Sequence, residues 1–233
     1  MNKLIIVGLF FFIASANAQI TNLQMNGVPL RTSGYEGVEG SPYLFDDWGK
    51  AEVVTKNGGI KDNVSYKLNI HENELVVINE SGNQIILDKN YVDHFIVERP
   101  AEEISLGVGL MSKLVFKNGF ENIRGVTEKD FINVLVEDEP YSLIRKFYSD
   151  LVTPPKNSYA PSQGRMFVFE QTFYLINSNG EANSVRNRTN SFISGLAKED
   201  KNLAKSIVKE GKLDLSREDH MVIFVQKLNQ AKQ

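Results

Sequence analysis

Two adjacent carboxylates, Asp46 and Asp47, are the residues of this chain best suited to acid–base chemistry, and they precede Trp48, the only tryptophan. Carboxylates beside an aromatic ring are typical of sites that cleave sugars. Glycoside hydrolysis, however, needs two carboxyl groups that face each other across roughly 5–10 Å. Neighbouring residues on a strand point to opposite faces. The pattern therefore favours a turn before the first long strand.

The three histidines of the chain, His71, His94 and His220, do not have the spacing of a metal site. No two of them lie one helical turn apart, as zinc-binding pairs on a helix do. The chain contains no cysteine, which excludes thiolate nucleophiles, disulfides and thiolate metal ligands. We expect surface or packing histidines and no bound metal.

Other polar motifs are also incomplete. Glu102-Glu103 and Glu137-Asp138-Glu139 lack the spaced ligands of a calcium loop, which favours solvated loops or hairpin tips. Gly107-Val108-Gly109 lacks the third glycine and the lysine of a phosphate-binding loop. No Gly-x-Ser-x-Gly nucleophile motif occurs. We therefore predict no catalytic residue, no cofactor-binding residue and no cofactor.

The apolar segment Ile104–Met111 allows two interpretations. Exposed, its Leu106, Val108, Leu110 and Met111 side chains would form a contact patch. Buried, they would belong to the core, which is the interpretation that we favour for an apolar run.

Charge and length exclude one class of partner and limit the number of domains. The formal net charge is −3, with acidic and basic residues mixed along the 233 residues. Nucleic-acid binding needs a basic face, so we expect none. A chain of this length has room for one large β domain or two small domains.

The elements that must position any site are short β-type runs separated by turn residues. Asn57-Gly58 and Asn118-Gly119 end two of these runs, and such pairs tolerate the positive φ angles of tight hairpins. This spacing predicts an antiparallel arrangement. The predicted strands cover residues 51–56, 64–70, 75–78, 84–87, 91–97, 113–116, 131–136, 141–147, 166–169, 172–176 and 182–185.

The hydrophobic period changes to that of helices from Thr189 onward. Helices are predicted over 191–196 and 199–210, with Gly211 as a left-handed C-cap. A third helix should follow Ser216, which begins a capping-box pattern. The fold class is therefore mainly β, α+β overall: an antiparallel meander, sandwich or partly closed barrel with two to three C-terminal helices.

The domain prediction starts from a secretory signal peptide. Residues 1–18 combine Lys3, an eleven-residue apolar run and Ala16-Asn17-Ala18, so cleavage is expected before Gln19. The apolar run is too short to span a bilayer, which takes about 20 residues. We expect no transmembrane segment in the mature chain. An extended arm over 19–39, a β domain over 40–188 and a helical segment over 189–233 follow, with a possible division of the sheet near 100–112.

Part of this pattern resembles a group of exported proteins from Bacteroidota. The signal peptide, Gly40-Ser41-Pro42-Tyr43-Leu44 at the start of the fold, and the tyrosine-bearing run and turn over 173–180 carry the resemblance, together with the charged helices that follow. The resemblance implies a Gram-negative envelope location, a mostly β fold with C-terminal helices and no assigned catalytic residue. The chain lacks the C-terminal sorting module common in secreted proteins of that phylum, which favours a periplasmic or outer-membrane-associated protein.

These observations predict an exported, non-enzymatic interaction protein, such as an accessory subunit of an envelope assembly. Strand edges suit this function because a partner strand can extend them. One alternative is a protein that binds a small ligand such as a lipid or glycan, with a pocket walled by Tyr43, Phe45, Trp48 and Tyr66. A second alternative is a hydrolase whose site lies near Asp46, Asp47 and His94.

Overall fold

The computed structural model of the chain describes residues 25–31, 34–153 and 164–233. The predicted signal peptide and the first residues of the predicted arm lie outside these ranges. Among the described residues, no helix has both the length and the apolar character needed to cross a membrane.

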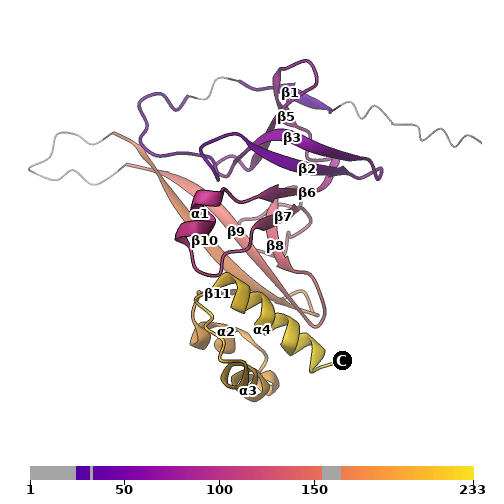
Figure 1. Cartoon of the computed structure of the whole chain (residues 1–233), viewed down its shortest axis with the longest axis vertical. Coiled ribbons are helices and arrows are strands. Elements are labelled where there is room, and N and C mark those ends of the chain that lie inside the picture. Colours follow the sequence, from indigo (N-terminus) through magenta and orange to yellow (C-terminus); the bar gives the residue numbers. More distant parts are fainter. Residues whose placement is uncertain (1–24, 32–33, 154–163) are drawn as a thin grey trace, which may run out of the picture.

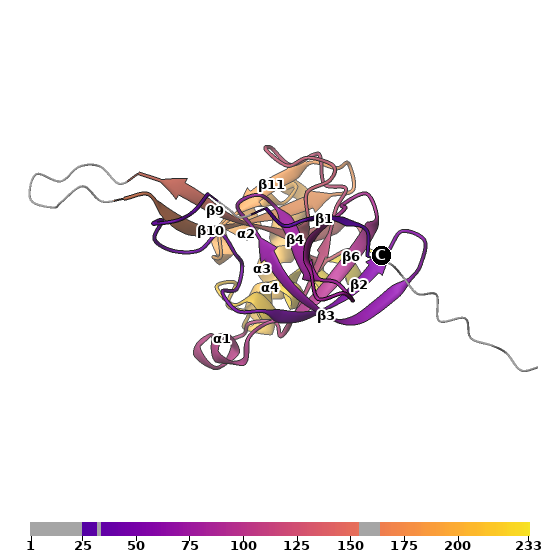
Figure 2. The same cartoon turned by 90° about the horizontal axis from the view of Figure 1, so that it is seen from above.

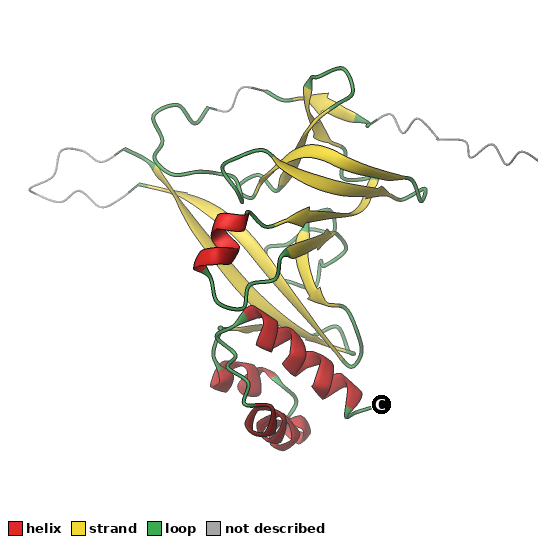
Figure 3. Ribbon diagram, viewed as in Figure 1, coloured by secondary structure: helices red, strands yellow, loops and turns green. Residues whose placement is uncertain are grey.

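The described residues form an antiparallel sheet of eleven strands (Figures 1 and 3). Its order is β1-β5-β4-β3-β2-β6-β7-β8-β9-β10-β11, and every neighbouring pair is antiparallel. β1 and β11 lie at the two ends, so the sheet is open. The predicted fold class, with mainly antiparallel strands and helices at the C-terminus, is confirmed. The strands are β1 (Gly27–Pro29), β2 (Gly49–Thr55), β3 (Ile60–Asn69), β4 (Glu74–Ile78), β5 (Gln84–Leu87), β6 (Val92–Glu98), β7 (Lys113–Lys117), β8 (Ile132–Val136), β9 (Tyr141–Val152), β10 (Met166–Asn177) and β11 (Ala182–Val185).

Local sequence explains the hairpins of this sheet. Gly58, between β2 and β3, has a φ of 81°, and Gly119, after β7, has a φ of 98°. These left-handed conformations favour glycine, so the Asn-Gly pairs lie where the chain must turn. Within β2, the alternate residues Ala51, Val53 and Thr55 are buried. This period of two matches a strand with one face against a core.

Three hydrophobic clusters occur among the described residues, and the two larger ones hold the fold together; the smallest surrounds Ile132 and Ile144. The first large cluster packs on β2–β7 and includes stacked rings of Phe95 and Phe116, whose centroids lie 5.0 Å apart. The second lies between β8–β11 and the C-terminal helices, where Leu143 and Phe224 are fully buried. The helices therefore cover one end of the sheet (Figure 1).

The helices are α1 (Ala101–Leu106), α2 (Thr189–Gly195), α3 (Lys201–Gly211) and α4 (Glu218–Gln230), and a short 3-10 turn, Lys198–Asp200, precedes α3. Two of the predicted helix ends are wrong. Lys212, with a φ of 48°, is the left-handed residue after α3, and Gly211 is still helical. Ser216 does not cap α4, because its hydroxyl donates to Asp214 Oδ1 and Arg217 holds the N-cap position.

β10 differs from the prediction in a way that matters for the site. The sequence predicts two runs, 166–169 and 172–176, because Glu170 and Gln171 are poor strand residues. The structure has one strand of twelve residues, which pairs with β9 along its whole length without a register shift. The ladder to β9 overrides the weak local preference. The outer halves of both strands extend beyond the other strands (Figure 2).

Candidate functional site

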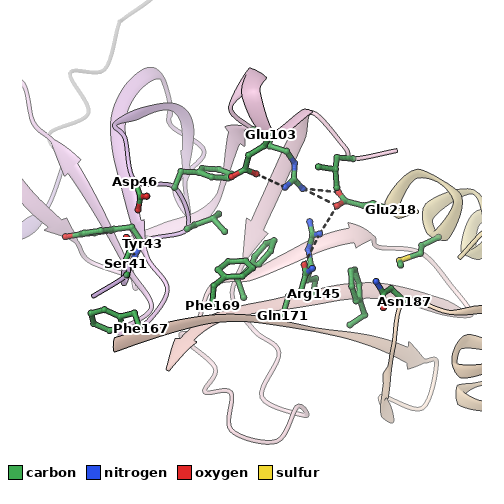
Figure 4. Close-up of a pocket in the computed structure, with 18 of the residues that line it drawn as sticks. Ser41, Tyr43, Asp46, Glu103, Arg145, Phe167, Phe169, Gln171, Asn187 and Glu218 are labelled. Carbon is green, nitrogen blue, oxygen red and sulfur yellow. Dashed lines mark hydrogen bonds and ion pairs between the residues drawn. The ribbon is translucent and has the colours of Figure 1, made fainter. Parts of the chain in front are cut away.

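A groove of about 560 Å³ lies over one face of β9 and β10 (Figure 4). Phe167, Phe169, Gln171 and Phe173 of β10 form its floor. One wall comes from the segment 40–46, and the other comes from Val108 and Leu110 after α1 and from the start of α4. The groove thus joins four segments that are remote from one another in the chain: 40–46, 108–110, β10 and the start of α4.

The edge of β10 that borders this groove is covered at one end. Phe167 N donates to Glu39 O at 2.8 Å, and Glu39 N donates to Arg165 O at 3.2 Å. The contact is close, because a Cβ added to Gly40 would lie 2.8 Å from Phe167 O. Gly40 also has a φ of 77°, a conformation that favours glycine.

The other end of the same edge is covered by β11, whose Val185 pairs with Phe173. Alternate residues of a strand direct their N–H and C=O groups to the same edge. Phe169 and Gln171 therefore direct these groups outward, beside Phe167 and away from β9. No backbone or side-chain group of the described residues forms a hydrogen bond with them there. Four backbone groups are consequently available at the rim of the groove.

A buried ion-pair network forms the wall of the groove next to α4. Glu218 Oε2 accepts hydrogen bonds from Arg145 Nη1 at 2.7 Å and from Arg99 Nη2 at 3.1 Å. Arg145 also donates twice to Asn133 Oδ1, at 3.0 and 2.8 Å. Its guanidinium lies 4.3 Å from the centroid of the Phe147 ring. Most donors of this network are used within the protein, so its evident role is to position the wall.

Electrostatics of the network follow from its burial. Burial lowers the pKa of the Arg145 guanidinium, and the Glu218 carboxylate opposes that shift. A second carboxylate, Glu103, is more exposed and pairs with Arg99, with 3.3 Å between Oε2 and Nη1. Two buried arginines are therefore matched by one buried and one partly exposed carboxylate. This arrangement fixes charge in place and does not pair a nucleophile with a base.

An exposed apolar patch adjoins the groove. The predicted burial of the segment 104–111 is wrong: Leu106 and Val108 are 86% and 73% exposed. The segment is held away from the core because Gly109 O accepts from Asp219 N at 2.8 Å. Met111 N also donates to Glu218 Oε1 at 3.3 Å. We define Ile104, Leu106, Val108 and Met111 as the apolar rim.

The structure separates the acidic residues singled out in the sequence. Asp46 and Asp47 are both exposed, but only Asp46 lines the groove. His94 Nδ1 contacts Asp93 Oδ2 at 2.6 Å on β6 and does not line the groove. Trp48 lies beside Lys67, at 5.7 Å from its ammonium to the ring centroid.

Only two of the four aromatic residues proposed as pocket walls line the groove. Tyr43 and Phe45 line the groove, and Trp48 does not. Tyr66 is buried, with a hydroxyl that has no partner among the described residues. Burial raises the pKa of the Tyr66 hydroxyl, with a further contribution from Glu103.

The two remaining histidines have packing roles. His71 Nδ1 lies 2.7 Å from Ser149 O, and its ring contacts Tyr35 and Phe167 edge-on. His220 Nδ1 accepts from Asp214 N at 2.9 Å. Within residues 25–31, 34–153 and 164–233, no group of three or more histidines and carboxylates could hold a metal.

Sequence reasoning missed Phe169 and Gln171 as site residues. The available signal was the interruption of an aromatic run, Met166–Phe169, by Glu170 and Gln171 without any glycine or proline. A polar pair inside a strand without a turn residue indicates an exposed position. That signal alone does not say which edge of the strand is open.

Comparison with known proteins adds no information on the site. No protein-family model matches the chain, no curated protein matches it, and no solved structure is significantly similar to it.

Proposed function

We propose that the protein is a non-enzymatic binding protein that captures an extended segment of a partner protein along the open edge of β10. One observation carries the proposal: the outward N–H and C=O groups of Phe169 and Gln171 are unpaired among the described residues and border an aromatic groove. Unpaired strand edges are templates for another chain, and an added strand gains main-chain hydrogen bonds while its side chains enter pockets.

The size of the opening defines what fits. A segment that pairs with Phe169 and Gln171 can form four backbone hydrogen bonds between the points where Glu39 and Val185 cover the edge. In an antiparallel pair, directly opposite residues have their side chains on the same face. The partner residues opposite Phe169 and Gln171 would therefore project into the groove.

Two apolar surfaces favour a protein partner. Phe169 is 51% exposed and rests against Phe147, with ring centroids 5.9 Å apart. Val108 of the apolar rim, which is 73% exposed, lines the same groove after α1. Exposed aromatic residues in a pocket are typical anchors of protein interfaces, and contiguous apolar surface marks interaction sites.

We place this activity in the cell envelope of a Gram-negative bacterium. Support comes from the signal-peptide pattern of residues 1–18 and from the resemblance of the mature sequence to exported proteins of Bacteroidota. The partner would then be a periplasmic or outer-membrane protein, and this chain its accessory subunit.

A second candidate function is binding of a lipid or glycan in the same groove. The groove volume lies in the range of small-molecule sites, roughly 300–1,000 Å³. Tyr43 and Phe45 also line it as expected for that function.

The test is copurification from the native host with a C-terminal tag, using wild type, Phe169→Ala and Phe169→Pro. Proline removes the outward N–H and leaves the β9 ladder intact, because that N–H faces away from β9. Phe169→Ala removes the ring but keeps the N–H and is therefore the matched control. A stoichiometric partner that Phe169→Pro loses more completely than Phe169→Ala would support strand addition. Equal recovery with all three proteins would contradict it, and a monomer stabilised by lipid or glycan would favour the second candidate.

A further inference from the structure

Two arginines stand where β11 leaves the edge of β10. Arg186 and Arg188 flank Asn187 in the connection from β11 to α2, and all three line a pocket that also contains Gln171 and Phe173. This pocket adjoins the groove, because Gln171, Phe173 and Asn187 line both. Figure 4 shows Asn187 at the opposite end of the groove from Asp46.

The backbone of this connection is fixed by hydrogen bonds. Arg186 N donates to Ser191 Oγ at 2.9 Å, and Arg188 N donates to Arg186 O at 2.7 Å. Ser191 N in turn donates to Arg188 O at 3.0 Å. Both arginines are consequently held next to the open edge of β10 rather than on a free loop.

Neither guanidinium has a carboxylate within ion-pair distance in the described part of the chain. The carboxylate that shares their pocket, Glu170, accepts a hydrogen bond from Tyr148 Oη at 2.8 Å. Both arginines are exposed. They are therefore available to a carboxylate from another molecule, and arginine binds carboxylates in a two-pronged geometry.

The opposite end of the groove carries the opposite charge. Asp46 is exposed there and has no ion-pair partner among the described residues. An acidic group bound at that end would be repelled by Asp46, whereas one bound near Phe173 would face the arginines. The groove therefore has a negative end and a positive end along β10, and this difference favours one placement of a charged segment.

We infer that the partner segment is an extended peptide with an acidic residue at the end next to Phe173, where Arg186 and Arg188 bind its carboxylate, and apolar residues opposite Phe169. This inference rests on the proposed strand addition and specifies its partner. Backbone pairing supplies the docking, and the arginine pair supplies the orientation.

The test is selection from a displayed library of random ten-residue peptides on the full mature chain. Synthetic versions of the enriched peptides are then measured by fluorescence anisotropy against wild type, the double variant Arg186→Glu/Arg188→Glu and Phe169→Pro. Arg124→Glu, which changes an exposed arginine outside both pockets, is the matched control. Thermal melts of every variant confirm that it is folded.

We expect the enriched peptides to share an acidic residue at one end of a segment with alternating apolar residues. The double variant should bind them about tenfold more weakly, because it replaces a charge-assisted contact with repulsion between carboxylates. Arg124→Glu should bind as wild type does. Peptides that Phe169→Pro binds more weakly but that show no acidic preference, or that bind the double variant as they bind wild type, would overturn this inference alone. Failure to enrich any peptide sensitive to Phe169→Pro would overturn the proposed strand addition itself.

Discussion

Arg145 on β9 and Glu218 at the start of α4 form a buried ion pair, with 2.7 Å between Nη1 and Oε2 and only 3% of either side chain exposed. Seventy-three residues separate them in the chain. Glu218 also accepts from Arg99, which follows β6. One carboxylate thus joins the helical segment to two parts of the sheet and shapes the wall of the groove.

Glu218→Gln should destabilise the protein strongly, because it leaves two buried guanidinium groups with no buried counter-ion. Removing one partner of a buried pair costs about 3–5 kcal/mol, and urea unfolding followed by circular dichroism would measure the loss. Glu103→Gln is the matched control, since Glu103 also pairs with Arg99 but is far more exposed. Its effect should stay below about 1 kcal/mol, and equal effects of the two variants would refute the role given to Glu218.

Asn229→Ala should also destabilise the fold, by about 1–3 kcal/mol. Asn229 on α4 is fully buried and acts like a strand partner for the first residue of β9. Its Nδ2 donates to Tyr141 O at 2.7 Å, and its Oδ1 accepts from Tyr141 N at 3.0 Å. Alanine leaves both backbone groups buried without partners. Thermal unfolding would measure the loss, and an unchanged melting temperature would show that water replaces the amide.

Gly40→Ala should loosen the covered end of the β10 edge. The substitution places a Cβ 2.8 Å from Phe167 O and forces a side chain into a φ of 77°, a strain of about 1–3 kcal/mol. Hydrogen exchange at the Phe167 amide, which donates to Glu39 O, should become faster. Gly34→Ala, where a Cβ meets nothing within 4 Å, should leave that rate unchanged.

Stability should depend on acid pH through Asp200. Burial opposes ionisation of Asp200, but hydrogen bonds from Lys232 and Tyr141 outweigh it and hold the pKa of this carboxyl below its usual value. The unfolded chain therefore binds this proton more readily than the folded protein. The stabilisation is fully present above a pH of about 4 and is lost as the pH falls through the lower pKa of the folded state.

Melting temperatures recorded between neutral and strongly acid pH would test this relation. In both Asp200→Asn and Lys232→Gln, the melting temperature should fall less steeply than in wild type as the pH is lowered. Burial and the hydrogen bond to Asp200 raise the pKa of Tyr141 to about 12, so its contribution should persist until alkaline pH. If the melting temperature of Asp200→Asn falls with pH as steeply as that of wild type, Asp200 does not cause the acid dependence of stability.

Local information in the sequence determined most of the secondary structure. Alternating residues such as Ala51 and Val53 indicate a strand with one buried face, and Gly58 and Gly119 indicate hairpin turns. The helical tail was equally clear from its period. These features follow from side-chain direction and backbone conformation, which depend on near neighbours.

Tertiary structure alone decided the site. Glu170 and Gln171 lie inside a strand because β9 pairs with them, and Phe169 lies at an open edge because Glu39 and Val185 stop short of it. The exposed position of Leu106 likewise depends on the contact of Gly109 with α4. Pairing, register and edge exposure are set by contacts between residues far apart in the chain, whose energies a local pattern does not contain.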